Sequence, residues 1–362
     1  MKSLHLMMAA CVLTSLAACE KKSNPVPSTE ELVFPSATSW QTAEPSSLGI
    51  SNAELAEFKK YLVSSNTRAF LLLKDGRIVI EEYQNNDLIG KPFGQNSQWY
   101  WASAGKTLTA FTTGMAQEQG FLDINQKTST YLGKGWTSLP SAKEDLITVK
   151  NQLSMTSGLD LSVADPSCFE PSCLQYAADA GTRWDYHNGP YTLLDQVIEN
   201  ATKKSFEEYF NAVLRNKIGM DGNWIWVKND HVFFSTPRSM ARFGILMANN
   251  GDWDGQTIMQ DKAYFQQLTN TSQQLNKSYG YLWWLNGKES AMVPGVQVVF
   301  NRWLTPSAPA DLVAAMGKNG QLLNIVPSKG LIVVRMGEFS DSGQVGLDVQ
   351  EEIWSRLGSM MD

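Results

Sequence analysis

The stretch Trp101-Ala102-Ser103-Ala104-Gly105-Lys106 places a serine and a lysine three residues apart. The residues from 102 to 118 are mostly good helix formers, so we expect a helix there. Side chains three residues apart lie on one face of a helix, which brings the Lys106 amine to the Ser103 hydroxyl. A serine hydroxyl needs such a base to act as a nucleophile. Because a Ser-x-x-Lys match is also expected by chance in a chain of 362 residues, a simple pair on a helix surface is the alternative.

The local setting would suit chemistry, although the pair alone does not outweigh the alternative of a surface pair. A lysine withdrawn from water has a lowered pKa and can accept a proton. The start of a helix also leaves backbone N–H groups free to stabilise a developing oxyanion. Ser103 and Lys106 form the only Ser-x-x-Lys pair in the sequence.

Two other short motifs each occur three times, and one copy of each lies in a suitable place. Tyr186-His187-Asn188 lies in turn-rich sequence, whereas the other two Tyr-x-Asn copies fall at a predicted strand end and within a predicted helix. Lys318-Asn319-Gly320 opens a strand near the end of the chain. The other two Lys-x-Gly copies form a hairpin turn and a helix exit.

Segments rich in β-formers lie at both ends of the chain, with helical segments between them. The N-terminal part predicts a helix over 51–64 and a hairpin over 67–83, with Asp75-Gly76 as its turn. The C-terminal part predicts strands over 279–285, 296–300, 312–316, 322–326 and 331–336, and a helix over 348–357.

The simplest packing is an α/β (α+β) fold in which both ends build one mixed, mainly antiparallel sheet flanked by helices. We assign residues 46–100 and 275–362 to this sheet lobe. Residues 101–274 form an inserted, mostly helical lobe. A cleft between two such lobes is a common place for a binding site.

The N-terminus has the pattern of an export signal. Lys2 is followed by an apolar run from 4 to 16, too short to span a bilayer, which ends in Ala17-Ala18-Cys19. This ending resembles the lipobox of bacterial lipoproteins, in which the cysteine is acylated and becomes the first mature residue. We therefore expect a signal peptide over 1–18, a lipid on Cys19 and a flexible tether over 19–45. An ordinary signal peptide that happens to contain a cysteine is the alternative.

Cys168 and Cys173 remain after Cys11 and Cys19 are assigned to the signal region. An exported protein meets oxidising conditions, so we expect them to form a small loop disulfide. Zinc needs three or four ligands, and the chain has three histidines and no His-Glu-x-x-His motif. We expect no metal and no cofactor. The formal net charge of −6 gives no reason to expect nucleic-acid binding.

Taken together and in this order, the three motifs resemble those of the penicillin-recognising serine hydrolases. The closest resemblance is to the class C β-lactamase-like branch, which also contains DD-peptidases and esterases. Segments 153–159 and 235–244 and the closing hairpin from 320 to 334 are similar to family segments as well. The resemblance covers roughly residues 45 to 360 and implies a β-lactamase/transpeptidase-like fold.

The resemblance also implies roles for the site residues. Ser103 would carry the acyl group, and Lys106 and Tyr186 would share acid and base work, with the first proton acceptor left open. The substrate would be bound by Asn188, Lys318, Gly320 and Gln321. The backbone N–H groups of Ser103 and Gln321 would hold the oxyanion.

One departure from the family pattern concerns the substrate. Asn319 replaces the usual threonine of Lys-Thr-Gly, and with it a hydroxyl that helps to hold the carboxylate of penicillin-type substrates. His187 fills the middle of Tyr-x-Asn, and a residue in that position generally points elsewhere.

We therefore expect an exported serine hydrolase, lipid-anchored at the cell envelope, that cleaves a small-molecule or peptide ester or amide. A DD-peptidase or β-lactamase is the first alternative. A non-catalytic cell-wall or β-lactam binding protein on the same fold is the second. The chain has no Gly-x-Ser-x-Gly nucleophile elbow.

Overall fold

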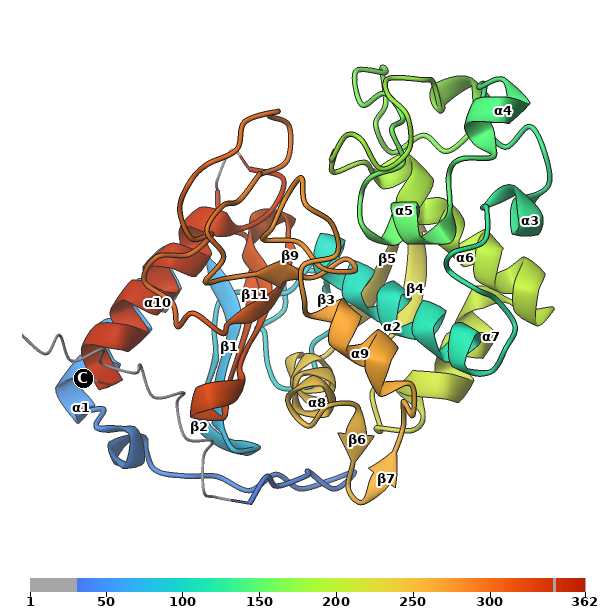
Figure 1. Ribbon diagram of the computed structural model, residues 1–362. Helices are drawn as coiled ribbons and strands as arrows, with labels where there is room; N and C mark the ends of the chain where they lie inside the picture. The colour runs from blue at the N-terminus through green and yellow to red at the C-terminus, as the bar shows by residue number, and fades with distance from the viewer. Residues whose placement is uncertain (1–30, 341–342, 362) are drawn as a thin grey trace, which may run out of the picture.

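The computed structural model describes residues 31–340 and 343–361 (Figure 1). The predicted signal peptide and Cys19 lie outside the described residues. No helix in the described part of the chain is both long enough and apolar enough to cross a membrane.

The fold is a mixed α/β arrangement built around an antiparallel sheet, as the sequence predicts. The strand order in this six-stranded sheet is β2-β1-β11-β10-β9-β8. The strands of the sheet are β1 Thr67–Lys74, β2 Arg77–Tyr83, β8 Trp284–Leu285, β9 Val313–Gly317, β10 Gln321–Val326 and β11 Leu331–Gly337. Strand β1 from the N-terminal part pairs with β11 from the C-terminal part, so the two ends of the chain share one sheet.

Local sequence chemistry explains the predicted hairpin. Strands β1 and β2 meet at a turn in which both Asp75 and Gly76 have positive φ. A Cβ on Gly76 would lie 1.9 Å from the Val33 carbonyl oxygen, so only glycine fits there. Strands β9, β10 and β11 confirm three of the C-terminal strand predictions to within a residue or two.

Helices cover the sheet. The helices are α1 Asn52–Ser64, α2 Lys106–Glu118, α3 Ser129–Leu132, α4 Ser141–Glu144, α5 Val149–Leu153, α6 Asn188–Thr202, α7 Phe206–Phe210, α8 Pro237–Ala248, α9 Lys262–Leu268 and α10 Leu347–Met361. Helices α1 and α10 lie on one side of the sheet, and α8 lies on the other (Figure 1). The Ser51 side chain caps α1 through the Glu54 N–H, as its sequence predicts.

Helix α8 differs from the predicted lobe assignment, because it packs on β10 and β11 although it falls within 101–274. Gly244 makes this close contact possible. A Cβ there would lie 2.8 Å from side-chain atoms of Leu323 and Ile332. The sheet lobe therefore takes one helix from the inserted segment.

The inserted segment is also less helical than predicted. It contains a hairpin of two strands, β4 Asn223–Val227 and β5 Asp230–Ser235. This hairpin pairs with β3 Trp99–Tyr100 to form a second, three-stranded sheet. Both hairpin strands are rich in aromatic and β-branched residues, which favours strands over helices. A further short pair, β6 Asp252–Trp253 and β7 Gln256–Thr257, follows α8.

Two strand predictions are wrong. Only Trp284–Leu285 of the segment 279–285 is a strand, because Leu282 has a φ of 60° that interrupts the extended backbone. Segment 296–300 lies in a loop rather than in a strand, and its valines are 41–51% exposed. Their β-branched composition predicts a strand, but in the described structure only Phe300 of this segment pairs, in an isolated bridge with Ala291.

The predicted flexible tether is wrong for its last part. The Val33 N–H donates to the Asp75 carbonyl at 3.0 Å, and the Ala43 N–H donates to the Ile78 carbonyl at 2.9 Å. Arg242 also binds the carbonyl of Pro35. These backbone contacts fix residues 33–43 along the hairpin of β1 and β2.

Candidate active site

Ser103 lies in a tight turn between β3 and α2. Residues Ala102–Gly105 form a 3₁₀ turn, and the α-helix begins only at Lys106 rather than at 102. Ala102 has a φ of 47°, which is unusual for a residue with a side chain. Trp101 anchors the turn, because its N–H donates to the Phe233 carbonyl and its indole donates to the Ser235 hydroxyl, both at 2.8 Å. The Ser103 side chain is left partly exposed.

Lys106 reaches Ser103 as the sequence predicts. Its Nζ donates to Ser103 Oγ at 3.3 Å, and its side chain is buried. Burial lowers the pKa of Lys106 to about 8, although the charges of Asp230 and Asp195 oppose this shift. The amine faces the rings of Tyr191 and Tyr186, at 4.0 and 5.5 Å from their centroids. The arrangement supplies an amine that can lose its proton in mildly alkaline solution.

Tyr186 lies close to both the Lys106 amine and the Ser103 hydroxyl. Its ring is buried and stacks on Trp284, with centroids 5.6 Å apart. Burial raises the pKa of Tyr186 well above its usual range, and the Ser103 hydroxyl partly offsets the rise. The phenol is therefore protonated near neutral pH and suits donation of a proton.

Asn188 begins helix α6 and faces the same space. Its Nδ2 donates to Ser167 Oγ at 3.2 Å and to Asp230 Oδ1 at 3.4 Å. Its neighbour His187 is buried, and neither ring nitrogen has a hydrogen-bond partner among the described residues. Burial lowers the pKa of His187 to about 4, against the opposing charge of Asp185. His187 is absent from the cavity lining, in agreement with its expected orientation.

The Lys318-Asn319-Gly320 motif forms a 3₁₀ turn between β9 and β10. Gly317, just before it, packs against the nucleophile turn, because a Cβ there would lie 3.0 Å from the Ser103 nitrogen. Asn319 has a φ of 62°, and its Nδ2 donates to the Tyr100 hydroxyl at 2.8 Å. The side-chain amide of Asn319, which replaces the family threonine, is thus hydrogen-bonded to a residue of β3.

Gly320 and Gln321 have structural contacts that the sequence does not reveal. Arg335 Nη1 donates to the Gly320 carbonyl at 2.7 Å. The Gln321 side chain exchanges hydrogen bonds with the Gly337 backbone and links β10 to β11. Neither residue lines the cavity, so a contribution from Gln321 is limited to its backbone N–H.

A cavity of about 530 Å³ brings the predicted Ser103, Lys106, Asn188 and Lys318 together. It is also lined by residues that sequence reasoning missed, namely Pro166, Ser167, Tyr191, Asp230, His231, Val232 and Gln344. The pair Asp230-His231 offers one signal, because it places an acid beside one of only three histidines. A larger groove of about 850 Å³ between α1 and α10 contains none of the predicted site residues.

His231 lines both this cavity and a second pocket of about 440 Å³. Its Nδ1 lies 2.7 Å from Asp195 Oδ2, and its ring stacks on Trp226 at a centroid distance of 4.4 Å. Burial raises the pKa of Asp195, while its contact with His231 opposes the rise. This pair packs beneath the wall that carries Asp230.

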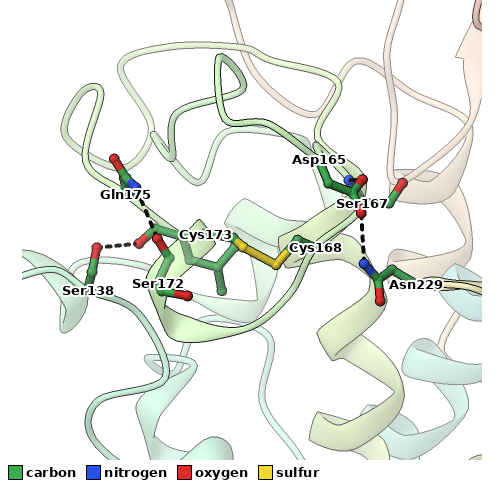
Figure 2. The surroundings of a disulfide bond; sticks show 9 residues. Ser138, Asp165, Ser167, Cys168, Ser172, Cys173, Gln175 and Asn229 are labelled. Carbon is green, nitrogen blue, oxygen red and sulfur yellow. Dashed lines mark hydrogen bonds between the residues drawn. A yellow bond between two sulfur atoms is a disulfide. The ribbon is translucent and has the colours of Figure 1, made fainter.

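Cys168 and Cys173 form a disulfide at the rim of the cavity (Figure 2). The closed loop packs on the start of α6, because the Gly189 N–H donates to the Pro166 carbonyl at 3.0 Å. A Cβ on Gly189 would lie 2.4 Å from the Cys168 carbonyl oxygen. The disulfide therefore braces the loop that supplies Pro166 and Ser167 to the wall.

Solved structures of several hydrolases and penicillin-binding protein homologues share this fold. A penicillin-binding protein homologue from Caulobacter crescentus matches with a TM-score of 0.65 and 13% identity, over 86% of this chain and 97% of the other. A family VIII carboxylesterase matches with a TM-score of 0.64 and 16% identity, over 90% and 98%. A Bacillus anthracis protein provisionally designated 6-aminohexanoate-dimer hydrolase matches with a TM-score of 0.64 and 18% identity, over 91% and 88%.

At these identities the solved structures establish the fold alone. The sequence identifies the family, because the family model described as Beta-lactamase matches residues 66–346. That range contains all three motifs and the whole cavity lining. The chain therefore belongs to the beta-lactamase family.

Proposed function

We propose that this protein is a serine hydrolase that cleaves an ester or amide through an acyl-enzyme on Ser103. The observation that carries the proposal is the 3.3 Å contact between Lys106 Nζ and Ser103 Oγ, made by a buried lysine with a pKa of about 8. The carboxylesterase and penicillin-binding protein homologues with the same fold support this class of activity.

The first half of the reaction forms the acyl-enzyme. Deprotonated Lys106 takes the Ser103 proton as Oγ bonds to the substrate carbonyl carbon. The backbone N–H groups of Ser103 and Gln321 hold the oxyanion. The tetrahedral intermediate then breaks its bond to the leaving group. That group takes the Tyr186 phenolic proton, and Tyr186 recovers a proton from Lys106.

The second half releases the acid. Water loses a proton to the same Lys106 and Tyr186 pair and adds to the acyl carbon. Collapse of this intermediate breaks the bond to Oγ, which regains its proton. The high pKa of Tyr186 favours Lys106 as the first base and Tyr186 as the first acid.

An ester or a simple amide suits the site better than a β-lactam. The Asn319 side chain is bound to Tyr100 and offers no hydroxyl to a substrate carboxylate. The test compares activated esters, nitrocefin and a D-Ala-D-Ala peptide with wild-type protein and Ser103→Ala. Ester turnover lost in Ser103→Ala supports the proposal, and ester turnover kept by that variant overturns it. Dominant nitrocefin or peptide cleavage selects the β-lactamase or DD-peptidase alternative.

We also propose that the protein is an exported lipoprotein, anchored through Cys19. The support is the apolar run that ends in Ala17-Ala18-Cys19. Incorporation of labelled palmitate in cells, and its loss in Cys19→Ala, is the expected result. Equal labelling of both proteins contradicts the anchor.

A further inference from the structure

Asp230 places a negative charge in the wall of the cavity that holds Ser103. It is the first residue of β5, it is half-buried, and it lines the cavity. Among the described residues no lysine, arginine or histidine forms an ion pair with it. A carboxylate in such a place is costly unless a donor or a cation meets it.

The hydrogen bonds of the Asp230 side chain leave most of its acceptor positions unused. Its only side-chain hydrogen bond in the described structure comes from Asn188 Nδ2, at the long distance of 3.4 Å. A carboxylate offers about four acceptor positions. The Asn188 amide points its nitrogen at Asp230, and its Oδ1 is buried, so Asp230 is the acceptor of this pair that faces the cavity.

Asp230 is held in place by the loops around it. Asn229, in the turn just before it, donates to Asp165 Oδ2 at 2.8 Å (Figure 2). Asp165 in turn accepts from the Ser167 N–H, at 3.0 Å. These contacts fix the backbone next to Asp230 against the loop that leads into the disulfide.

A carboxylate with most of its acceptor positions unused matches a cation that has several N–H donors and no acceptor. Lys106 and Lys318 line the same cavity, and the charge of Asp230 acts on Lys106, but neither lysine forms an ion pair with Asp230 among the described residues.

We infer that Asp230 binds an ammonium group of the substrate, so that the preferred substrates are esters or amides with a free amine near the scissile carbonyl. This inference rests on the proposed serine hydrolase function. Asp230 thus selects substrates and takes no part in the bond changes at Ser103.

The experiment compares charged and neutral substrates that are otherwise matched. Alanine benzyl ester against N-acetylalanine benzyl ester, in both enantiomers, places the amine in the acyl group. The pair 4-(aminomethyl)phenyl acetate and 4-(acetamidomethyl)phenyl acetate places it in the leaving group. Each kcat/KM is measured for wild type, Asp230→Asn and Asp160→Asn. The last is a control, because Asp160 is a half-buried acid of the same lobe that binds Ser162 outside the cavity.

Wild type and Asp160→Asn are expected to prefer the free amine in at least one pair, by roughly tenfold or more in kcat/KM. Asp230→Asn is expected to bring that ratio close to one, and the ratio cancels any general effect on Ser103. No preference in either pair, or a preference that survives in Asp230→Asn, overturns the inference while Ser103-dependent turnover stands. If Ser103→Ala hydrolyses these esters as fast as wild type, the proposed function fails first.

Discussion

Lys106 Nζ donates a hydrogen bond to Ser103 Oγ at 3.3 Å while the rest of the lysine side chain is buried. Two aromatic rings face this amine, and the charges of Asp230 and Asp195 oppose the effect of burial on its pKa. The balance gives a base whose protonation changes within an accessible pH range. Several measurable properties depend on this contact and on the residues that fix it.

The pH dependence of acylation reports on Lys106. The lysine accepts a proton only in its neutral form, and its pKa is about 8. We therefore expect kcat/KM for a non-titrating ester to rise with pH and to level off above about 8. Asp230→Asn removes a charge that raises this pKa, so its rising limb is expected at lower pH. A flat profile from pH 6 to 9 contradicts the role of Lys106.

Tyr186→Phe tests the proton donor. The variant keeps the ring that stacks on Trp284, so folding is expected to survive. Loss of the hydroxyl is expected to lower kcat roughly 100-fold or more, since general acid catalysis contributes on that scale. The loss is expected to be smaller for an ester with a very acidic alcohol, because such a leaving group needs no proton. Equal losses of kcat for good and poor leaving groups contradict the role of Tyr186 as the proton donor to the leaving group.

The disulfide is expected to stabilise both the fold and the cavity wall. A loop as short as that between Cys168 and Cys173 contributes about 2 kcal/mol through the unfolded state. The double variant Cys168→Ser/Cys173→Ser is expected to lose about that much free energy of unfolding in urea. It is also expected to raise KM, because Pro166 and Ser167 lose their brace. An unchanged KM shows that the loop does not contribute to substrate binding.

His187 is expected to make the protein sensitive to acid. Its pKa is about 4 in the folded protein, below the ordinary value of 6.5. The unfolded chain therefore binds a proton between these values that the folded protein does not, and stability falls as pH decreases. From pH 7 to 5 this costs about 2 kcal/mol of the free energy of unfolding.

The matched variant for this prediction is His187→Gln, which has no group that titrates there. It is expected to lower stability at pH 7, because the buried ring is lost, but to flatten the change between pH 7 and 5. Urea unfolding of both proteins at pH 7 and pH 5 measures this change in the free energy of unfolding. An equal slope in both proteins assigns the acid sensitivity to other groups.

The sequence predicts the features that depend on neighbouring residues. The Asp75-Gly76 turn, the Ser51 cap and the Ser103–Lys106 spacing each follow from chemistry within a few positions along the chain. The family resemblance adds the order of the three motifs and hence the meeting of Asn188 and Lys318 with Ser103 in one cavity.

Features set by distant contacts could not be predicted in this way. The predicted helix start at 102 fails because Trp101 is bound to Phe233 and Ser235, which impose a tight turn on Ala102. Asp230 enters the cavity through a hairpin in a segment that we expected to be helical. Such placements need the packed structure, since the only local signal for them is the histidine that follows Asp230.

The most direct test of the central claim is to label the protein with a fluorophosphonate and map the adduct by mass spectrometry. We predict one adduct, on the peptide that contains Ser103, formed faster as pH rises through about 8. Ser103→Ala is expected to remain unlabelled, and Ser157→Ala, which changes a buried serine outside the cavity lining, is expected to label like wild type. Absence of labelling in folded wild-type protein, or an adduct on another residue, contradicts a Ser103 nucleophile.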